Sequence, residues 1–356
     1  MSKIVVLGSG SGSHAMAADL AINGNEVYML VLPEWIHELA PVIEKGYIQT
    51  EGILCEKARI KCVTSDPKKA LDGAECIFCP LPAYAQESYC KWIADFIQND
   101  QILLFTPGLM GCLIMKKVMD NKKIDKKILL AETSELPYSC RGSSGTVNIM
   151  SKFQVMCSAL PAIKTQEVIE TASKFLPLIK AENILQCAIH STNPCYHVPG
   201  CILNAGRIER SKGEFYLYEE GITPCVARVM EILDEERMKI ANEVGGLLFS
   251  VPEEMAGSRE PRTIFEELNG CMSMEFIKGP SSLQDRYLTE DIPYGLMVWS
   301  EIARIAGVET PMINALIEIS SPILKMDILS EGRNAEKMGV AGMNIDRLMF
   351  FVNDLD

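Results

Sequence analysis

The sequence lacks two features that would place it in other classes of protein: a long apolar run and an excess of positive charge. Without a run of about 18 apolar residues, it has no candidate for a membrane-spanning helix. Acidic residues outnumber basic ones by 47 to 34, for a formal net charge of −13, which argues against a nucleic-acid partner. The N-terminal residues also lack the pattern of a signal peptide, so we expect a cytoplasmic protein that binds neither nucleic acid nor membrane.

Clusters of metal-binding residues are missing as well. The 13 cysteines are odd in number and scattered, which favours free thiols in a reducing compartment. One CxxC pair, Cys76 and Cys79, falls in an apolar segment typical of a buried strand. A zinc site would need further ligands close by, so we predict no metal site and no redox role for this pair.

The order of apolar segments divides the chain into two parts. In the first part, short strand-like segments such as Lys3–Leu7 and Gln101–Phe105 alternate with helix-like ones. This alternation predicts a Rossmann-type α/β domain with a doubly wound parallel sheet over residues 1–184. From about residue 185 the apolar residues recur with the 3.6-residue period of helices. We therefore predict an all-α domain over residues 185–356.

A loop of alternating glycine and serine follows the first strand and precedes the first helix. Glycine lets a ligand approach the backbone, and a helix N-terminus favours a pyrophosphate. Strand, glycine loop and helix in this order are the context of a dinucleotide-binding motif, so we predict that NAD or NADP binds here. The predicted cofactor-binding residues are the loop and the strand ends expected at the same edge of the sheet: Gly8, Ser9, Gly10, Ser11, Gly12, Ser13, Val31, Leu81, Pro82 and Thr106.

Two positions depart from the usual motif. Ser13 stands where the third glycine of GxGxxG is expected, and its hydroxyl is suited to capping the helix or binding a phosphate. Val31 ends the second strand, where an acidic residue would bind the ribose of NAD. No arginine nearby favours NADP, so both cofactors stay open. A plain αβ turn without a ligand is the alternative interpretation.

Histidine is rare in this chain, and two of the four histidines lie in an unusual polar stretch that opens the second domain. His190 and His197 fall within residues 188–200, whereas His14 lies at the first helix and His37 in a segment that looks exposed. Histidine is the usual proton carrier near neutral pH. Taken alone, His197 fits a hydrogen-bonded structural histidine better than a catalytic one.

A second polar stretch spans residues 279–296. It places Arg286, Glu290 and Asp291 just ahead of an apolar helix. Helix capping and surface ion pairs are the simplest explanation of such charges.

Four segments together resemble the octopine/nopaline (opine) dehydrogenase family over essentially the whole chain. They are Gly10–Ala18, Glu132–Arg141, Asn193–His197 with Leu203–Arg207, and Arg286–Asp291 with Pro293–Leu296. The last two segments are the more specific. The resemblance implies an NAD(P)-dependent dehydrogenase that acts on CH–NH bonds. Such enzymes join the amino group of an amino acid to a 2-keto acid such as pyruvate, and reduce the imine to an N-(carboxyalkyl) amino acid, or run the reverse.

The same resemblance implies roles for four residues of the second domain. His197 is the expected acid/base, and Asp291 is expected to bond its other ring nitrogen, which fixes the tautomer and stabilises the imidazolium. Arg286 is expected to bind a substrate carboxylate, since its planar fork does this better than lysine. Asn204 is expected to orient the substrate or the histidine. The partners are then small-molecule substrates, and a homodimer is considered.

Two alternatives share the glycine loop. A dehydrogenase of the 2-hydroxyacid, ketopantoate or glycerol-3-phosphate type also carries a helical domain, but relies on an active-site lysine. A non-catalytic NAD(P)-binding redox regulator needs no His–Asp pair at all. Which side chains accompany His197 therefore distinguishes the three.

Overall fold

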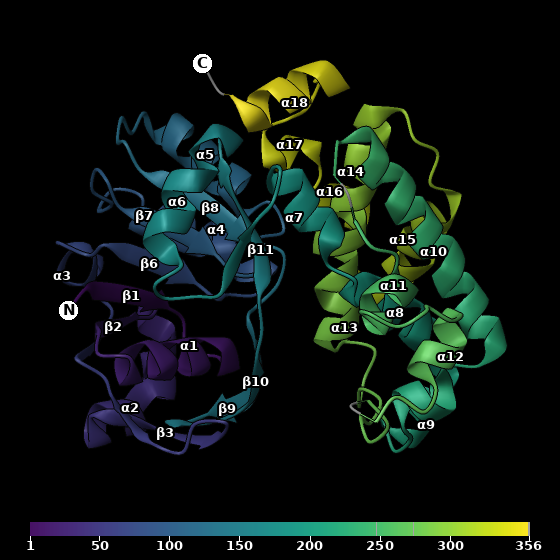
Figure 1. Cartoon of the computed structure of the whole chain (residues 1–356), viewed down its shortest axis with the longest axis horizontal. Coiled ribbons are helices and arrows are strands. Elements are labelled where there is room, and N and C mark those ends of the chain that lie inside the picture. The colour runs from purple at the N-terminus through teal and green to yellow at the C-terminus, as the bar shows by residue number, and fades with distance from the viewer. Residues whose placement is uncertain (247, 273, 355–356) are drawn as a thin grey trace. The chain divides into compact units, whose positions relative to one another are not determined.

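The computed structural model describes residues 1–246, 248–272 and 274–354, and these form two compact units (Figure 1). The first unit comprises Met1–Cys187 together with the described residues from Phe350 onward, and the second comprises Ala188–Met349. The predicted division between residues 184 and 185 lies three residues before this one. The last residues, which the sequence pattern assigns to the helical domain, group with the first unit.

The larger sheet of the first unit contains, in the described part of the chain, eight strands in the order β12-β11-β8-β7-β6-β1-β2-β5. Their bounds are β1 (Lys3–Leu7), β2 (Glu26–Leu30), β5 (Cys62–Thr64), β6 (Cys76–Cys79), β7 (Ile102–Phe105), β8 (Leu129–Thr133), β11 (Val155–Leu160) and β12 (Leu178–Lys180). Neighbours from β5 to β8 pair in parallel, which confirms the Rossmann-type sheet.

This sheet is not wholly parallel, which corrects the prediction. Strand β11 runs antiparallel to β8. A parallel neighbour needs a crossover, usually a helix, and the segment between these two strands holds a β-hairpin instead.

Helices lie along the chain between these strands. They are α1 (Ser11–Ile22), α2 (Ala40–Lys45), α3 (Pro67–Leu71), α4 (Ala83–Ile93), α5 (Gly111–Lys122), α6 (Thr165–Ala172) and α7 (Ile184–His190), with 3-10 turns η1 (Pro33–Leu39) and η2 (Ala162–Lys164). Helix α7 follows the last strand and crosses the division between the units. Every residue of β6 and β7 is buried, as expected for strands covered on both faces. Residues 33–45 form two separate helical pieces, η1 and α2, because Pro41 lacks an N–H and stands in the first turn of α2.

A smaller sheet, which the sequence pattern does not indicate, has the order β4-β3-β10-β9. Its strands are β3 (Tyr47–Gly52), β4 (Lys57–Arg59), β9 (Tyr138–Ser143) and β10 (Thr146–Lys152). The β9–β10 hairpin is tied to helix α1 by a buried carboxylate: Asp19 accepts 2.6 Å hydrogen bonds from Tyr138 Oη and Lys152 Nζ. The hairpin therefore lies directly on the helix that follows the glycine loop.

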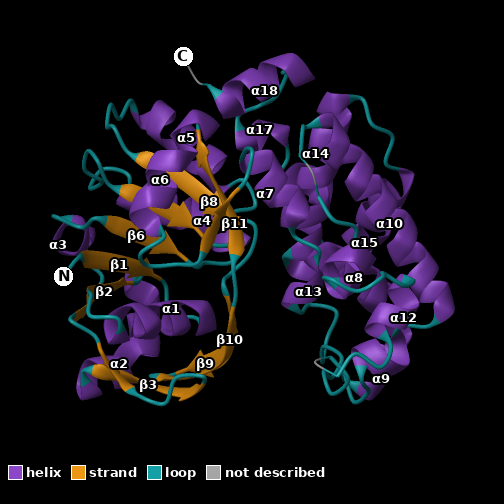
Figure 2. Ribbon diagram, in the orientation of Figure 1, coloured by secondary structure: helices purple, strands orange, loops and turns teal. Residues whose placement is uncertain are grey.

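The second unit is helical, as predicted, and Figure 2 shows the two sheets confined to the first unit within the described residues. Its helices are α8 (Asn193–Ile202), α9 (Ala205–Ser211), α10 (Pro224–Glu243), α11 (Val251–Ala256), α12 (Ile264–Leu268), α13 (Arg286–Thr289), α14 (Met297–Ala306), α15 (Pro311–Leu324), α16 (Ile328–Glu331) and α17 (Ala335–Met338), with π-helical segments η3 (Leu217–Gly221) and η4 (Asp291–Leu296); α18 (Ile345–Asn353) runs across the division. Trp299 is fully buried in this core and its Nε1 donates to Ala188 O. No helix in the described ranges is long and apolar enough to cross a membrane.

Candidate active site

The glycine loop between β1 and α1 is shaped for a ligand that approaches its backbone. Gly8 has φ +89°, and a Cβ there would lie 2.4 Å from Leu81 Cδ2, so only glycine fits. Gly10, in contrast, is exposed, and a Cβ there would meet nothing within 4 Å. Gly10 is also the N-cap of α1 and provides no side-chain cap, so the first N–H groups of a 12-residue helix stay available to an anion.

Two of the three serine hydroxyls of this loop, those of Ser11 and Ser13, bond to the protein itself. Ser13 Oγ donates to Leu7 O at 2.8 Å, which ties the helix back to strand β1. Ser11 Oγ donates to Gly142 O at 2.8 Å and accepts from Gly142 N at 3.1 Å. The hydrogens of the Ser11 and Ser13 hydroxyls are therefore used within the protein, while the backbone N–H groups at the start of α1 stay available to a cofactor.

The other predicted cofactor residues follow the carboxyl ends of adjacent strands. Val31 comes after β2, Leu81 and Pro82 after β6, and Thr106 after β7, and these strands neighbour one another in the sheet order β7-β6-β1-β2. Three of these side chains are buried: Val31 and Thr106 are inaccessible and Leu81 is 5% exposed. Val31 belongs to the core, so its side chain cannot replace the missing ribose-binding acid.

The structure brings His197 and Asp291 together although 94 positions separate them. His197 on α8 and Asp291 at the start of η4 are joined by a 2.6 Å hydrogen bond between Nδ1 and Oδ2, with only 8% and 13% of their side chains exposed. A carboxylate only accepts, so Nδ1 carries the proton and donates it. Among the residues that the structure describes, none hydrogen-bonds to Nε2 of His197, which leaves that nitrogen for proton transfer.

A third residue of this site was not predicted. The ring of Tyr287 stacks on the imidazole of His197, with centroids 3.7 Å apart and planes 11° from parallel. Tyr287 lies on α13 and Asp291 at the start of η4, so two consecutive helical segments present these groups to the histidine. Asp285 caps this segment by accepting from Tyr287 N at 3.2 Å. The feature of the sequence that could have indicated Tyr287 is its position within Arg286–Asp291, one of the segments that resemble the family.

Arg286 is exposed beside this pair. Its guanidinium lies 5.6 Å from the Tyr287 ring centroid. In the described part of the chain no carboxylate forms an ion pair with Arg286, which argues against the surface ion pair considered from the sequence. Its planar fork is therefore open to an anion.

Asn204 is bonded within the protein through its amide nitrogen. Its Nδ2 donates to Gly200 O and to Gly221 O, both at 2.9 Å. Because both amide hydrogens are in use, Asn204 joins α8 to η3 and has no donor left for a substrate.

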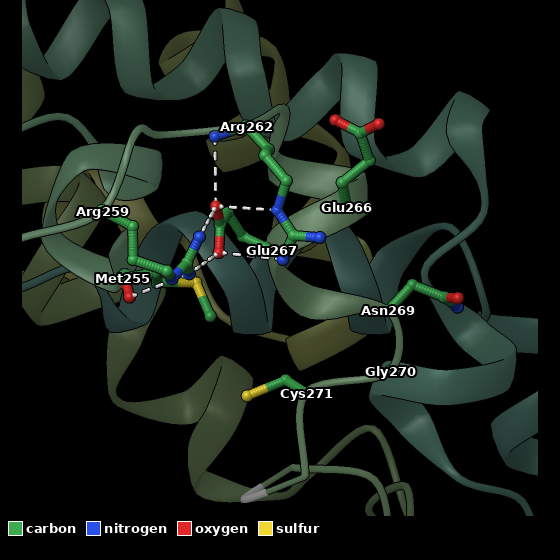
Figure 3. A pocket seen from close by; sticks show the side chains of 8 residues that line it. All are labelled: Met255, Arg259, Arg262, Glu266, Glu267, Asn269, Gly270 and Cys271. Carbon is green, nitrogen blue, oxygen red and sulfur yellow. Dashed lines mark hydrogen bonds and ion pairs between the residues drawn. The ribbon is translucent and has the colours of Figure 1, made fainter. Parts of the chain in front are cut away.

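Other polar features lie outside these sites. A hollow of about 200 Å³ in the second unit is lined in part by Arg259, Arg262 and Glu267, and both arginines form ion pairs with Glu267 (Figure 3). None of the predicted site residues lines this hollow. Cys76 and Cys79 are buried in β6, and burial raises the pKa of the Cys76 thiol to about 12, which suppresses thiolate chemistry. All 13 cysteines are free thiols.

Comparison with known proteins decides the family. Residues 180–324 match the family described as NAD/NADP octopine/nopaline dehydrogenase, alpha-helical domain. An opine dehydrogenase of Arthrobacter sp. (strain 1C) is 32% identical over 345 residues, which are 95% of each chain. The chain belongs to the opine dehydrogenase family. As a member it is an NAD(P)-dependent dehydrogenase that acts on CH–NH bonds and condenses an amino acid with a keto acid reductively, as the sequence resemblance implies.

Solved structures share the fold. Two structures of octopine dehydrogenase, one with NADH and L-arginine and one with NADH and pyruvate, cover 98% of each chain with TM-scores of 0.79 and 0.76 at 20% and 19% identity. The Rossmann-type sheet followed by a helical domain is thus the architecture of the family, and the family assignment sets aside the ketopantoate-type and regulatory alternatives.

Proposed function

We propose that His197 and Asp291 are the acid/base unit of this reductive condensation. The observation that carries the proposal is the 2.6 Å bond at Nδ1, together with an Nε2 that no described residue occupies. Asp291 holds the ring in the tautomer with its proton on Nδ1, so that Nε2 is the basic atom. The same carboxylate stabilises the positive charge that forms when Nε2 takes a second proton.

In the proposed reaction, His197 gives back the proton that it takes up and so returns to its starting state. Nε2 of His197 takes a proton from the substrate ammonium, which frees the amine to attack the keto carbon. As the C–N bond forms, a proton of the attacking nitrogen moves to the former carbonyl oxygen and makes it a hydroxyl. The imidazolium then gives its proton to this hydroxyl, the C–O bond breaks, water leaves and an iminium remains. NAD(P)H, when bound, supplies the hydride that reduces the iminium carbon to the secondary amine. No net proton is needed from His197 in that last step.

Arg286 is proposed to bind a carboxylate of the amino acid or the keto acid. Its exposed, unpaired guanidinium lies next to the ring that covers His197, so a carboxylate held there is close to the reacting atoms. Asn204 is left out of the proposed substrate contacts, because its donors are bonded within the protein. A 2-keto acid such as pyruvate and an amino acid are the proposed substrates.

The cofactor is proposed to bind over Gly8–Ser13, with its pyrophosphate at the N-terminus of α1. The free backbone N–H groups and the open space at Gly10 support this placement. Either NAD or NADP is accepted by the proposal, because a buried Val31 neither binds a ribose hydroxyl nor repels a 2′-phosphate. Titration with NADH and NADPH separates the two.

One experiment tests the proposed reaction directly. The purified protein is given NADH or NADPH with pyruvate or other 2-keto acids, against each common amino acid, taurine and β-alanine. We expect oxidation of the cofactor that requires both substrates, with formation of the N-(carboxyalkyl) product by mass spectrometry. Oxidation by the keto acid alone would mean a hydroxyacid dehydrogenase and would contradict the proposal.

A cytoplasmic location and a homodimer remain predictions. Cell fractionation and light scattering of the purified chain test them.

A further inference from the structure

His14 is the remaining buried histidine of the first unit, and no role follows for it from the reaction. It lies in the first turn of α1 and is inaccessible to solvent. Its Nδ1 is 3.0 Å from Gly10 O, and the Gly145 N–H donates to its Nε2 at 3.2 Å. One imidazole therefore links the glycine loop to the turn of the β9–β10 hairpin, 131 positions away.

These contacts fix the tautomer of His14. The backbone N–H of Gly145 can only donate, so Nε2 is the acceptor and Nδ1 carries the proton that goes to Gly10 O. Burial lowers the pKa of His14 and keeps the ring neutral. With both nitrogens bonded to backbone, His14 has no atom free for proton transfer and acts through the loop that it holds.

The loop is held at the same place by a second contact. Ser11 Oγ is bonded to both the N–H and the C=O of Gly142, so the start of helix α1 is joined to the β9–β10 hairpin at a second point. The hairpin itself is tightly constrained: a Cβ on Gly142 would lie 2.4 Å from Thr146 O, and Ser144 and Gly145 have φ of +52° and +80°. The backbone of the hairpin therefore has little conformational freedom, and the start of α1 is hydrogen-bonded to it.

The carbonyl oxygen of Gly10 is the loop atom that the His14 ring contacts. It accepts from His14 N at 2.9 Å as well as from Nδ1 at 3.0 Å, which sets the orientation of the Gly10 peptide and of the first helical N–H groups. These are the groups that the proposed function assigns to the pyrophosphate. Loss of the imidazole leaves this carbonyl with only the hydrogen bond from the backbone N of residue 14, and leaves the buried Gly145 N–H without an acceptor.

We propose that His14 is a positioning residue for the dinucleotide, and that the β9–β10 hairpin is part of the cofactor site through it. The inference rests on the proposed placement of the cofactor over Gly8–Ser13. It predicts that cofactor affinity depends on a side chain whose two ring nitrogens are both bonded to backbone, and on a hairpin from the second sheet.

The test compares four variants by titration with NADH and NADPH. His14→Leu removes both bonds at similar volume, and we expect the dissociation constant to rise on the order of tenfold. His14→Gln retains an acceptor for Gly145 and should recover part of the loss. In kinetics, the KM for the cofactor should rise more than kcat falls. Thr165→Val is the matched control, because Thr165 is also buried and its Oγ1 accepts from Ala159 N at 3.0 Å; it should lower stability without changing the dissociation constant.

Gly10→Leu distinguishes failure of this inference from failure of the cofactor site. A leucine there meets no protein atom near its Cβ and blocks only the approach to the loop. If Gly10→Leu loses the cofactor while His14→Leu and His14→Gln bind it like the native chain, the inference about His14 is overturned and the site stands. If Gly10→Leu also binds normally, the site itself is wrong.

Hydrogen exchange of the native chain covers the case in which the His14 variants do not fold. Coupling between two sites is reciprocal, so a cofactor that depends on the hairpin must also stabilise it. We expect the amides of residues 142–145 to exchange several-fold more slowly with NADH or NADPH bound. Unchanged exchange at these amides, under conditions where the cofactor is bound, would overturn the proposal.

Discussion

Helices α1 and α8 each hold a buried histidine, His14 and His197, and the two differ in what surrounds the ring. His14 bonds a backbone carbonyl at Nδ1 and a backbone N–H at Nε2. His197 bonds a carboxylate at Nδ1 and carries a stacked tyrosine on its face. A ring bonded by backbone at both nitrogens has no nitrogen left for proton transfer, whereas a carboxylate at one nitrogen fixes the tautomer and leaves the other nitrogen available. Burial alone therefore does not separate the histidine that we propose as the acid/base from the one that we propose as a positioning residue; the bonded partners do.

The largest expected effect comes from His197. His197→Ala should lower kcat by about 10²–10⁴-fold with little change in cofactor affinity, because it removes the proton carrier and not the glycine loop. Asp291→Asn should also lower kcat, since an amide can support the wrong tautomer. Steady-state kinetics and cofactor titration measure both.

The double variant shows whether His197 and Asp291 act as one unit. If they do, it loses much less than the product of the two single losses. Multiplicative losses would mean independent roles. His37→Ala is the control, because the His37 side chain is 68% exposed and lies in the first unit.

Arg286 should give the next largest effect. Arg286→Lys replaces a two-pronged contact with a point charge, so the KM of one substrate should rise roughly 10- to 100-fold while cofactor affinity is kept. Arg304→Lys, a change at an exposed arginine of α14, serves as the control. Equal kinetics in the two variants would return Arg286 to an ordinary surface residue.

Tyr287 sharpens the comparison, because a stacked ring is what the surroundings of His197 have and those of His14 lack. Tyr287→Leu should lower kcat about 2- to 10-fold and broaden the pH profile, since the ring that orients the imidazole is lost. Tyr287→Phe keeps the stacked ring and should stay near the native rate. A phenylalanine variant as slow as the leucine variant would assign the effect to the hydroxyl instead.

His190 is a third case, in which burial acts without a partner. Among the described residues none bonds its buried Nδ1, and burial, reinforced by the charge of Arg237, lowers the pKa of His190 to about 4. The unfolded chain takes up a proton near pH 6.5 that the folded chain refuses until about pH 4. The stability that neutral His190 allows is therefore complete above pH 6.5 and falls as the pH drops through this window, by up to about 1.4 kcal/mol per pH unit.

Urea unfolding between pH 7 and 4 measures this slope. His190→Gln should flatten the slope in that window and change little at pH 7, the smallest of the effects at neutral pH. The same slope in native chain and variant would assign the acid sensitivity to other groups.

The sequence by itself carried the local features. The strand–glycine loop–helix order and the alternation of strands and helices are determined by residues within a few positions of one another, and they were sufficient to predict the Rossmann-type sheet and the helical second domain. Tyr287 and Asp291 are also near each other in the sequence, four positions apart on the consecutive segments α13 and η4. Pro41 likewise indicates the start of a helix by its residue type alone, and it stands in the first turn of α2.

Only the tertiary structure decided the features that depend on distant partners. The smaller sheet pairs β3 with β10 across about a hundred positions, and strand patterns do not encode which strands pair. The bonds of Ser11 and Asn204 to backbone likewise appear only when Gly142 and Gly221 are brought close. His14 and His197 are equivalent as letters in the sequence. The fold sets them apart, because it places a backbone N–H against one ring and a carboxylate with a tyrosine against the other.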